Sequence, residues 1–261
     1  IEPEAAHDEV IDIFLTCATQ AMPFFSAQIE TTPFVKFACE KFFPLSAWKF
    51  IGATEGDPAQ TQLRLLKVFA ELCGHCGALE KAKEKIETIY NVLLEFLPPP
   101  PADLENMETP SILFSHVECL LYSIHALGKQ CPEFLAFAAE DDKLKDFRNR
   151  LQFLSRNTQG YVKKLQDEIK AGKVSKDPKT DEEKLKVIGL MTTSNIQTLI
   201  RDLYQSSYKA VVRLSWVPAK TKNVIKVDNG SEKKEIETVA GTKRHAPITF
   251  SNGDKGDGEK T

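Results

Sequence analysis

The sequence lacks any run of about eighteen apolar residues, the length that a helix needs to cross a membrane. Its first ten residues are acidic, whereas a signal peptide starts with basic residues and continues with apolar ones. We therefore expect a soluble chain that has no contact with a membrane and is not routed for secretion. The chain also starts without a methionine, and we interpret it as a fragment of a longer protein.

Sequence patterns of catalysis are missing as well. No glycine-rich phosphate-binding loop occurs, and no Ser, Cys or Asp pattern around His7, His125 or His245 forms a nucleophilic triad. A net charge of −3 predicts no general attraction to nucleic acid. We therefore expect neither an enzyme nor a cofactor, and nucleic-acid binding is an alternative that we do not favour.

Cysteine is scarce, with six residues at irregular positions in 261, so reduced thiols are expected rather than a disulfide framework. One pattern nevertheless needs comment, because Cys73-Gly74-His75-Cys76 matches the redox motif of protein disulfide isomerases. That chemistry requires a thiolate at a helix N-terminus. Apolar residues at helical spacing before the motif instead place Cys73 at a helix C-terminus, where the dipole raises the pKa of a thiol. A thiol oxidoreductase acting through Cys73 and Cys76 remains an alternative.

A zinc site is a second alternative that uses the same cysteines. Together with His116 and Cys119 they supply four ligands of suitable type. However, about forty residues separate the two pairs, and His116 and Cys119 fall inside a predicted helix, where a core cysteine is common. We therefore do not expect a metal.

Apolar residues recur at gaps of three and four along most of the chain, which is the pattern of one buried helix face. Three stripes are clear: Leu79, Ala82, Ile86, Ile89, Leu93 and Leu97; Leu113, Val117, Leu120, Ile124 and Leu127; and Leu185, Ile188, Thr192, Ile196, Leu199 and Leu203. Short Gly and Pro breaks separate the helices, so successive helices are expected to pack as antiparallel neighbours. The pattern predicts about eight helices in a stacked solenoid or an irregular bundle.

The last fifth of the chain changes character. Residues 207–217 alternate between apolar and polar and predict a strand-like strap, whereas residues 218–261 are too polar to form a core and predict a flexible tail. The helical domain would then span residues 1–206. Within the tail, Lys233, Lys234, Lys243 and Arg244 form two basic pairs that resemble a bipartite nuclear import signal. Before these regions, the prolines from Pro98 to Pro101 predict an exposed spacer, with an SH3-type ligand as the alternative.

Residues 143–170 combine a leucine spacing with an excess of positive charge. Leu144, Leu151 and Leu165 follow a seven-residue spacing that Thr158 interrupts. We favour a helix packed into its own core over a dimerising zipper, and we expect a monomer. Eight basic residues against three acidic ones give this segment an excess of five positive charges. They form a solvated helix face or a binding surface for an acidic partner or RNA. We assign protein binding to Leu144, Lys145, Arg148, Leu151, Arg156 and Leu165.

Several longer segments resemble one known family. They are PFFSAQIETTPFVKFACE at 23–40, FSHVECLLYSIHALGKQCPEFL at 114–135, KLKDFRNRLQFLSR at 143–156 and SYKAVVRLSWVP at 207–218. The order of these segments and the residues within them resemble the apoptosis inhibitor 5 family, also called antiapoptosis clone 11. The resemblance implies an all-α scaffold of armadillo- or HEAT-like helical repeats, with further repeats before this segment in the full-length protein.

The same resemblance carries functional expectations. It implies a non-enzymatic nuclear protein, present also in the cytoplasm, that restrains apoptosis through protein partners. The partners it implies are the chromatin-condensation factor Acinus and, in vertebrate members, fibroblast growth factor 2. It also places the leucine zipper of the family at Leu144, Leu151 and Leu165, where Thr158 departs from the leucine pattern.

Overall fold

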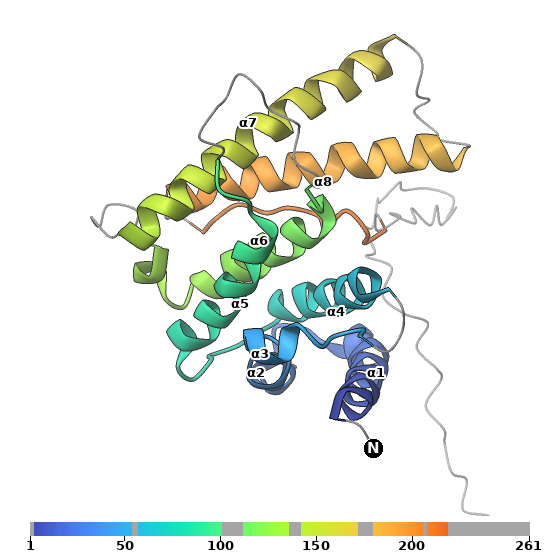
Figure 1. Ribbon diagram of the computed structural model, residues 1–261. Coiled ribbons are helices and arrows are strands. Elements are labelled where there is room, and N and C mark those ends of the chain that lie inside the picture. Colours follow the sequence, from blue (N-terminus) through green and yellow to red (C-terminus); the bar gives the residue numbers. More distant parts are fainter. Residues whose placement is uncertain are drawn as a thin grey trace, which may run out of the picture. The chain divides into compact units, whose positions relative to one another are not determined.

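The computed structural model describes residues 3–53, 57–100, 112–135, 142–171, 180–205 and 208–218 (Figure 1). Within these ranges the chain forms eight α-helices, two short 3-10 turns and no strand, which confirms the predicted all-α class. The helices are α1 (Pro3–Ala21), α2 (Thr32–Lys41), α3 (Leu45–Trp48), α4 (Pro58–Cys73), α5 (Ala82–Phe96), α6 (Phe114–Gly128), α7 (Asp142–Lys170) and α8 (Asp181–Tyr204). The turns are Met22–Phe24 and Pro132–Leu135.

Two of the helices begin at clear capping signals. Asp57 precedes α4 and its side chain accepts a hydrogen bond from the Gln60 amide at 3.2 Å, while Pro58 occupies a first-turn position that needs no N–H donor. Thr180 and Glu183 form a reciprocal capping box at the start of α8. These local contacts fix where the chain leaves a loop and enters each helix.

Helices α4 to α8 stack in two layers, and side-chain contacts give their relative directions. His116 near the start of α6 contacts the carbonyl of Ala59 near the start of α4, and Tyr122 farther along α6 lies beside Gly74 directly after α4, so these two helices run parallel. Glu118 and His125 of α6 contact α8 at Asn195 and Asp202, which are also seven residues apart, so α8 runs parallel to α6. Helices α4, α6 and α8 therefore form one layer of parallel helices.

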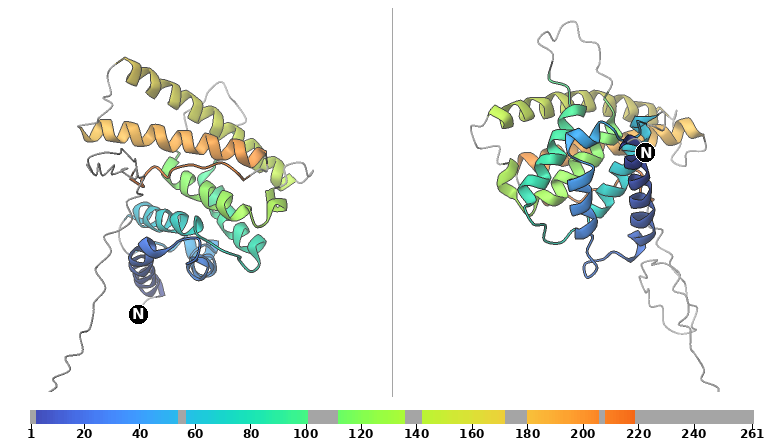
Figure 2. Two further views of the ribbon diagram at one scale, coloured as in Figure 1. Left: turned by 180° about the vertical axis from the view of Figure 1, so that it is seen from behind. Right: turned by 60° about the horizontal axis from the view of Figure 1, so that its bottom comes forward.

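The second layer repeats this order. Lys143 at the start of α7 pairs with Glu87 of α5, and Phe147 packs against Tyr90 with ring centroids 4.9 Å apart, so α5 and α7 lie side by side. Helix α5 also packs against α6, and α7 packs against α8 (Figure 2). Parallel helices within a layer and paired helices between layers are the arrangement of a helical-repeat solenoid. This confirms the predicted fold class.

Most residues of the predicted stripes are buried in the core. Leu79, Ile86 and Leu93 are buried, as are Val117 and Ile124. The stripe of α8 is buried only from Thr192 onward, because Leu185 is 67% exposed and Ile188 is 42% exposed. The prediction was wrong for these two residues, because α8 has 24 residues and α6 has 15, so the first turns of α8 extend past the helix on which it packs. It was also wrong for Leu113, which precedes α6 and is 44% exposed.

Residues 208–217 cross the layer of parallel helices (Figure 1). The Ala210 amide donates to Asp202 of α8 at 2.9 Å, and the Ser215 hydroxyl donates to Glu118 of α6 at 2.6 Å. The Trp216 indole then donates to Glu71 of α4 at 2.8 Å. The segment therefore ties three helices together through polar contacts along its length.

Gly128 of α6 is required where this segment begins. A Cβ atom at Gly128 would lie 2.4 Å from the ring of Tyr208, which is closer than side-chain contacts occur. Tyr208 itself has a positive φ of 49°, a conformation that non-glycine residues adopt rarely. A small residue in α6 thus allows the segment to start directly against the helix.

The chain divides into two compact units, residues 1–217 and 218–261. Beyond Pro218 the second unit lies outside the described residues, and so do the predicted import residues Lys233, Lys234, Lys243 and Arg244. None of the helices in the described ranges combines the length and apolar character that crossing a membrane requires.

Candidate protein-binding surface

Helix α7 carries the predicted binding residues, and its leucines point into the chain's own core. Leu151 is fully buried, and Leu144 and Leu165 are almost so. Thr158, which interrupts the leucine spacing, is also buried, and its hydroxyl donates to the Leu154 carbonyl at 3.0 Å. Leu144, Leu151 and Leu165 are therefore core residues in this fold. Their assignment to partner binding stays a prediction that requires α7 to leave its neighbours.

Three cations in the first half of α7 form ion pairs with other residues of the chain. Ion pairs join Lys143 to Glu87 at 2.6 Å, Lys145 to Asp142 at 3.2 Å and Arg150 to Asp146 at 2.7 Å. Lys143 also lies 4.8 Å from the centre of the Tyr90 ring. Opposite charges at these distances reduce the field that an approaching partner meets. The first two turns of α7 are therefore less attractive to an acidic partner than their sequence indicates.

The backbone of Arg148 joins α7 to α8. The residue is half-buried, and its carbonyl accepts a hydrogen bond from the Tyr204 hydroxyl at 2.9 Å. Burial raises the pKa of Tyr204. Arg148 is therefore only partly exposed to an approaching partner.

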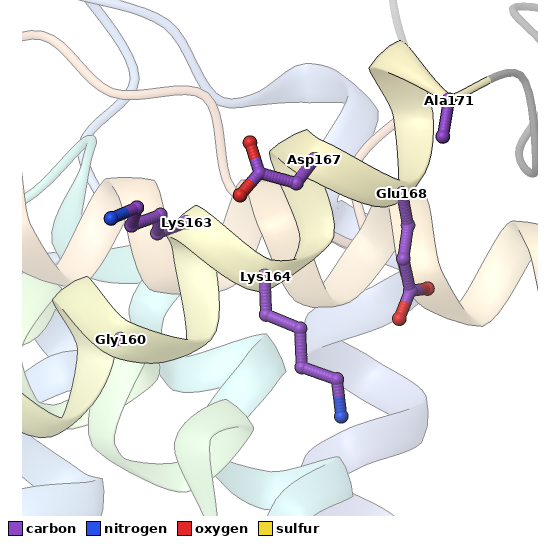
Figure 3. A pocket seen from close by; sticks show the side chains of 6 residues that line it. All are labelled: Gly160, Lys163, Lys164, Asp167, Glu168 and Ala171. Carbon is purple, nitrogen blue, oxygen red and sulfur yellow. The ribbon is translucent and has the colours of Figure 1, made fainter.

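The second half of α7 carries cations that remain exposed. Arg156, Lys163 and Lys164 form no ion pair with any residue in the described ranges. Lys163 and Lys164 border a hollow of about 460 Å³ whose lining comes from α7 and from Ala171 directly after it. Figure 3 shows Lys164 and Glu168 pointing to the same side of the helix. Glu168 in turn pairs with Lys186 of α8 at 3.4 Å. The available positive charge of α7 thus begins at Arg156.

A polar groove lies between α7 and α8, and we name it the α7–α8 groove. Helix α7 lines it with Gln152, Ser155, Arg156 and Gln159. Helix α8 lines it with Gln197, Ile200, Arg201 and Tyr204. Its volume is about 390 Å³, within the ~300–1,000 Å³ range of ligand pockets. Of these residues, only Arg156 was predicted from the sequence as a binding residue.

The residues from α8 were missed because α7 was considered by itself. Positions 197, 200, 201 and 204 repeat at gaps of three, one and three, so they form one helical stripe beside the buried stripe of Leu199 and Leu203. Antiparallel pairing of α7 and α8 brings this stripe opposite Gln152 to Gln159. The stripe is visible in the sequence, but the register that places it opposite α7 is not.

The surroundings of the cysteine motif are unfavourable for redox chemistry. Cys73 is the last residue of α4, as predicted, and it is buried. Burial raises the pKa of Cys73 far above its usual range, with the neighbouring Cys39 and Cys76 adding to the effect. Burial also raises the pKa of Cys76. A nucleophilic thiol needs a lowered pKa, so these surroundings oppose the oxidoreductase alternative.

The zinc alternative fails on geometry. The His116 ring nitrogen contacts the Ala59 carbonyl at 3.0 Å, and Cys119 is buried within α6. Among the residues that the structure describes, no group of three or more His, Cys, Asp or Glu side chains could hold a metal ion. Cys73, Cys76, His116 and Cys119 thus do not gather into one site.

Comparison with known proteins adds an independent observation. The family model described as "Apoptosis inhibitory protein 5 (API5)" matches residues 2–261. The chain is 46% identical over 250 residues to Apoptosis inhibitor 5 homolog of Drosophila melanogaster, with 94% of this chain and 43% of that protein covered.

Vertebrate relatives also match over most of the chain. Apoptosis inhibitor 5 of Homo sapiens is 39% identical over 241 residues, with 90% of this chain and 44% of that protein covered. Apoptosis inhibitor 5-B of Xenopus laevis is 38% identical over 250 residues, with 93% and 46% covered. The chain spans less than half the length of the curated relatives it matches.

Proposed function

The chain belongs to the Apoptosis inhibitory protein 5 family, and from this membership we propose that it inhibits apoptosis as a non-enzymatic scaffold for other proteins. The family and its relatives carry names of inhibitors and not of enzymes, which supports the non-enzymatic part of the proposal. The fold supports it too, because helical-repeat solenoids present extended surfaces to protein partners.

The exposed cations in the second half of α7 are the main support for this proposal. Arg156, Lys163 and Lys164 are exposed on α7 without an ion pair to a described residue, whereas Lys143, Lys145 and Arg150 of the same helix are paired. Exposed charge of one sign mainly accelerates association with an oppositely charged partner. We therefore place the protein-binding surface on the second half of α7, and keep Lys145 and Arg148 as its less exposed border.

For the partner, we propose an Acinus-like chromatin-condensation factor, and fibroblast growth factor 2 for vertebrate relatives. The proposed location is the nucleus, with a further population in the cytoplasm. The import residues Lys233, Lys234, Lys243 and Arg244 would direct the chain there. Replacing all four by Ala in a fluorescent fusion should move the fusion from the nucleus to the cytoplasm if this assignment holds.

The function is tested by caspase activation in cells that lack the endogenous protein. Wild-type chain should lower caspase activity after a death stimulus, and the variant Arg156→Glu/Lys163→Glu should protect less. A matched control reverses Lys41 and Lys49, which are exposed outside α7 and α8 and form no ion pair with a described residue. Equal loss of protection for both double variants would refute the placement of the surface on α7, and absence of protection by the wild type would refute the function for this chain.

Nucleic-acid binding is the second candidate, because exposed cations also attract phosphate groups. It predicts that the wild type binds RNA with an affinity that falls steeply with salt, and that the α7 double variant loses this binding. Protection from caspase activation that persists when RNA binding is abolished would separate the two functions.

A further inference from the structure

The α7–α8 groove brings together two arginines from facing helices. Arg156 and Arg201 both line it, and neither forms an ion pair with a residue in the described ranges. Axes of packed helices are ~8–10 Å apart, so two long guanidinium side chains on facing helices can reach the same ligand. A guanidinium group matches a carboxylate in a two-point geometry. The groove thus offers two unpaired sites for carboxylates.

Side-chain amides surround these arginines. Gln152 and Gln159 lie on either side of Arg156 along α7, and Gln197 faces them from α8. The Gln197 amide donates to the hydroxyl of Thr158 at 3.4 Å, which leaves its carbonyl oxygen as an acceptor. Amides supply both donors and acceptors, which is what the backbone of an extended peptide requires. A helix satisfies its own backbone and would not use them.

The rest of the lining limits the class of ligand further. Ile200 is almost buried at the base of the groove, and the Tyr204 hydroxyl is already bonded to the Arg148 carbonyl. Tyr204 is the one aromatic residue that lines the groove. Because its hydroxyl already donates to Arg148, it is not available to donate to a ligand. Proteins that bind single-stranded nucleic acid depend on several aromatic rings that stack on bases. The lining favours a peptide over RNA.

We propose that the α7–α8 groove binds an extended acidic peptide segment of a partner protein, with Arg156 and Arg201 holding two carboxylates and the three glutamines holding its backbone. This inference rests on the proposed function as a protein scaffold, and it adds the chemistry of the partner and the residues of α8. The buried Thr158 acts as a positioning residue, because its hydroxyl holds Gln197. A leucine at position 158 could not make this contact with Gln197.

The test uses the full chain and three labelled probes. The first is a ten-residue peptide of alternating Glu and Ser, the second replaces each Glu by Gln, and the third is a ten-nucleotide uridine RNA. Fluorescence anisotropy at low and physiological salt measures each dissociation constant. We expect the Glu peptide to bind at least tenfold more tightly than the Gln peptide, and more tightly than the RNA.

Variants then assign the binding to the groove. Arg156→Glu/Arg201→Glu should weaken binding of the Glu peptide at least tenfold, whereas the matched control Lys41→Glu/Lys49→Glu should stay within twofold of the wild type. Gln159→Trp keeps every charge but fills the groove, so it should weaken binding to a similar extent. Arg156→Lys/Arg201→Lys should retain part of the affinity, because lysine keeps the charge and loses the two-point geometry. Circular dichroism melts confirm that each variant is folded.

The outcomes separate this inference from the proposed function. Equal binding of the Glu and Gln peptides, or unchanged binding by Gln159→Trp, would overturn the acidic-peptide groove. Tighter binding of the RNA that the arginine variant abolishes would assign the groove to nucleic acid and also overturn it. If the peptide fails to bind but caspase protection still depends on Arg156 and Lys163, the scaffold function survives and only the groove is wrong.

Discussion

Glu118 of α6 accepts a hydrogen bond from the Asn195 side chain of α8 at 2.6 Å, and no part of Glu118 is exposed to solvent. The same carboxylate also accepts from the amide and the hydroxyl of Ser215, at 3.1 Å and 2.6 Å. Asn195 in turn donates to the carbonyl of Arg213 at 2.7 Å. One buried carboxylate thus joins two parallel helices and the segment that crosses them.

Removing this carboxylate should loosen the crossing segment and lower stability. Glu118→Ala leaves buried donors without an acceptor, and we expect a loss of about 2 to 3 kcal/mol in the free energy of unfolding. Urea unfolding followed by circular dichroism measures the loss. The control Glu80→Ala removes a largely exposed carboxylate that pairs with Lys36, and it should change stability by no more than ~0.5 kcal/mol.

Proteolysis provides a second reading of the same change. Lys209 and Arg213 are exposed in the crossing segment, and both are trypsin sites. Cleavage at these residues should be faster in Glu118→Ala than in Glu80→Ala. If the two variants were cleaved at the same rate, Glu118 would not hold the segment in place.

Stability should fall when the pH drops below about 6.5. Burial lowers the pKa of His125 below its usual 6.5, an effect that outweighs the nearby carboxylate of Asp202 at 2.6 Å and is assisted by Lys129. Burial likewise lowers the pKa of His116. Both histidines are therefore neutral in the folded chain at pH 7. Below 6.5 the unfolded chain binds more protons than the folded one, so protonation favours unfolding.

Urea unfolding at pH 7.5, 6.5 and 5.5 tests this prediction. Stability should be nearly constant between 7.5 and 6.5 and should decline toward 5.5. The variant His116→Gln/His125→Gln, which keeps a side-chain N–H group beside Asp202, should show a shallower decline over the same interval. A decline as steep as in the wild type would mean that other groups cause it.

The leucines of α7 can be tested as core residues. Leu151 is fully buried, so Leu151→Ala should cost about 2 to 5 kcal/mol in stability. Leu185→Ala changes a leucine that is 67% exposed and should have little effect. Thermal melting compares the two variants. An unchanged melting temperature for Leu151→Ala together with lost partner binding would favour the exposed zipper.

Two features of the sequence were sufficient to predict the helices: the periodic apolar residues and the breaks at Gly and Pro. Periodic apolar residues identified the buried faces of α5 and α6, and Gly and Pro residues identified the breaks between helices. These signals are local, because each depends on residues within one or two turns. Cys73 illustrates this, since the apolar residues before it correctly predicted a helix C-terminus.

The groove and the free cations could not be predicted in the same way. Whether Lys143 is available depends on Glu87, which lies 56 residues away in sequence and beside it in the fold. The pairing of Arg156 with Arg201 across the groove depends on the register between α7 and α8, which no local pattern specifies. The exposure of Leu185 depends on the relative lengths of α6 and α8. Each of these properties belongs to the packing of two helices.

Thiol labelling tests whether the cysteine motif is inert. Cys17 is the one exposed thiol among the six cysteines, whereas Cys73 is buried and burial raises the pKa of Cys39 to about 12. We expect one thiol to react rapidly with maleimide at pH 7, and Cys17→Ser should remove this fast reaction. Mass spectrometry identifies the labelled residue. Rapid labelling of Cys73 would revive the oxidoreductase alternative.

The last prediction compares cations from the two halves of α7 in binding a purified Acinus-like partner. Lys145 is partly neutralised by Asp142, whereas Lys163 and Arg156 form no ion pair with a described residue. Charges on a surface are screened beyond ~8 to 10 Å at physiological salt, so binding by the wild type should weaken as salt rises. Arg156→Glu/Lys163→Glu should lose most of this salt dependence, while Lys145→Glu should retain it.

Binding constants are measured from low to high salt for the wild type, the double variant and Lys145→Glu, and they show which half of α7 binds the partner. The melting temperatures should agree closely, because all three residues are on the surface. A salt dependence that is the same in the wild type and the double variant would show that the second half of α7 is an ordinary solvated face. A larger loss in Lys145→Glu than in the double variant would instead move the binding surface to the first turns of α7, where the ion pairs of the chain would have to open before a partner could bind.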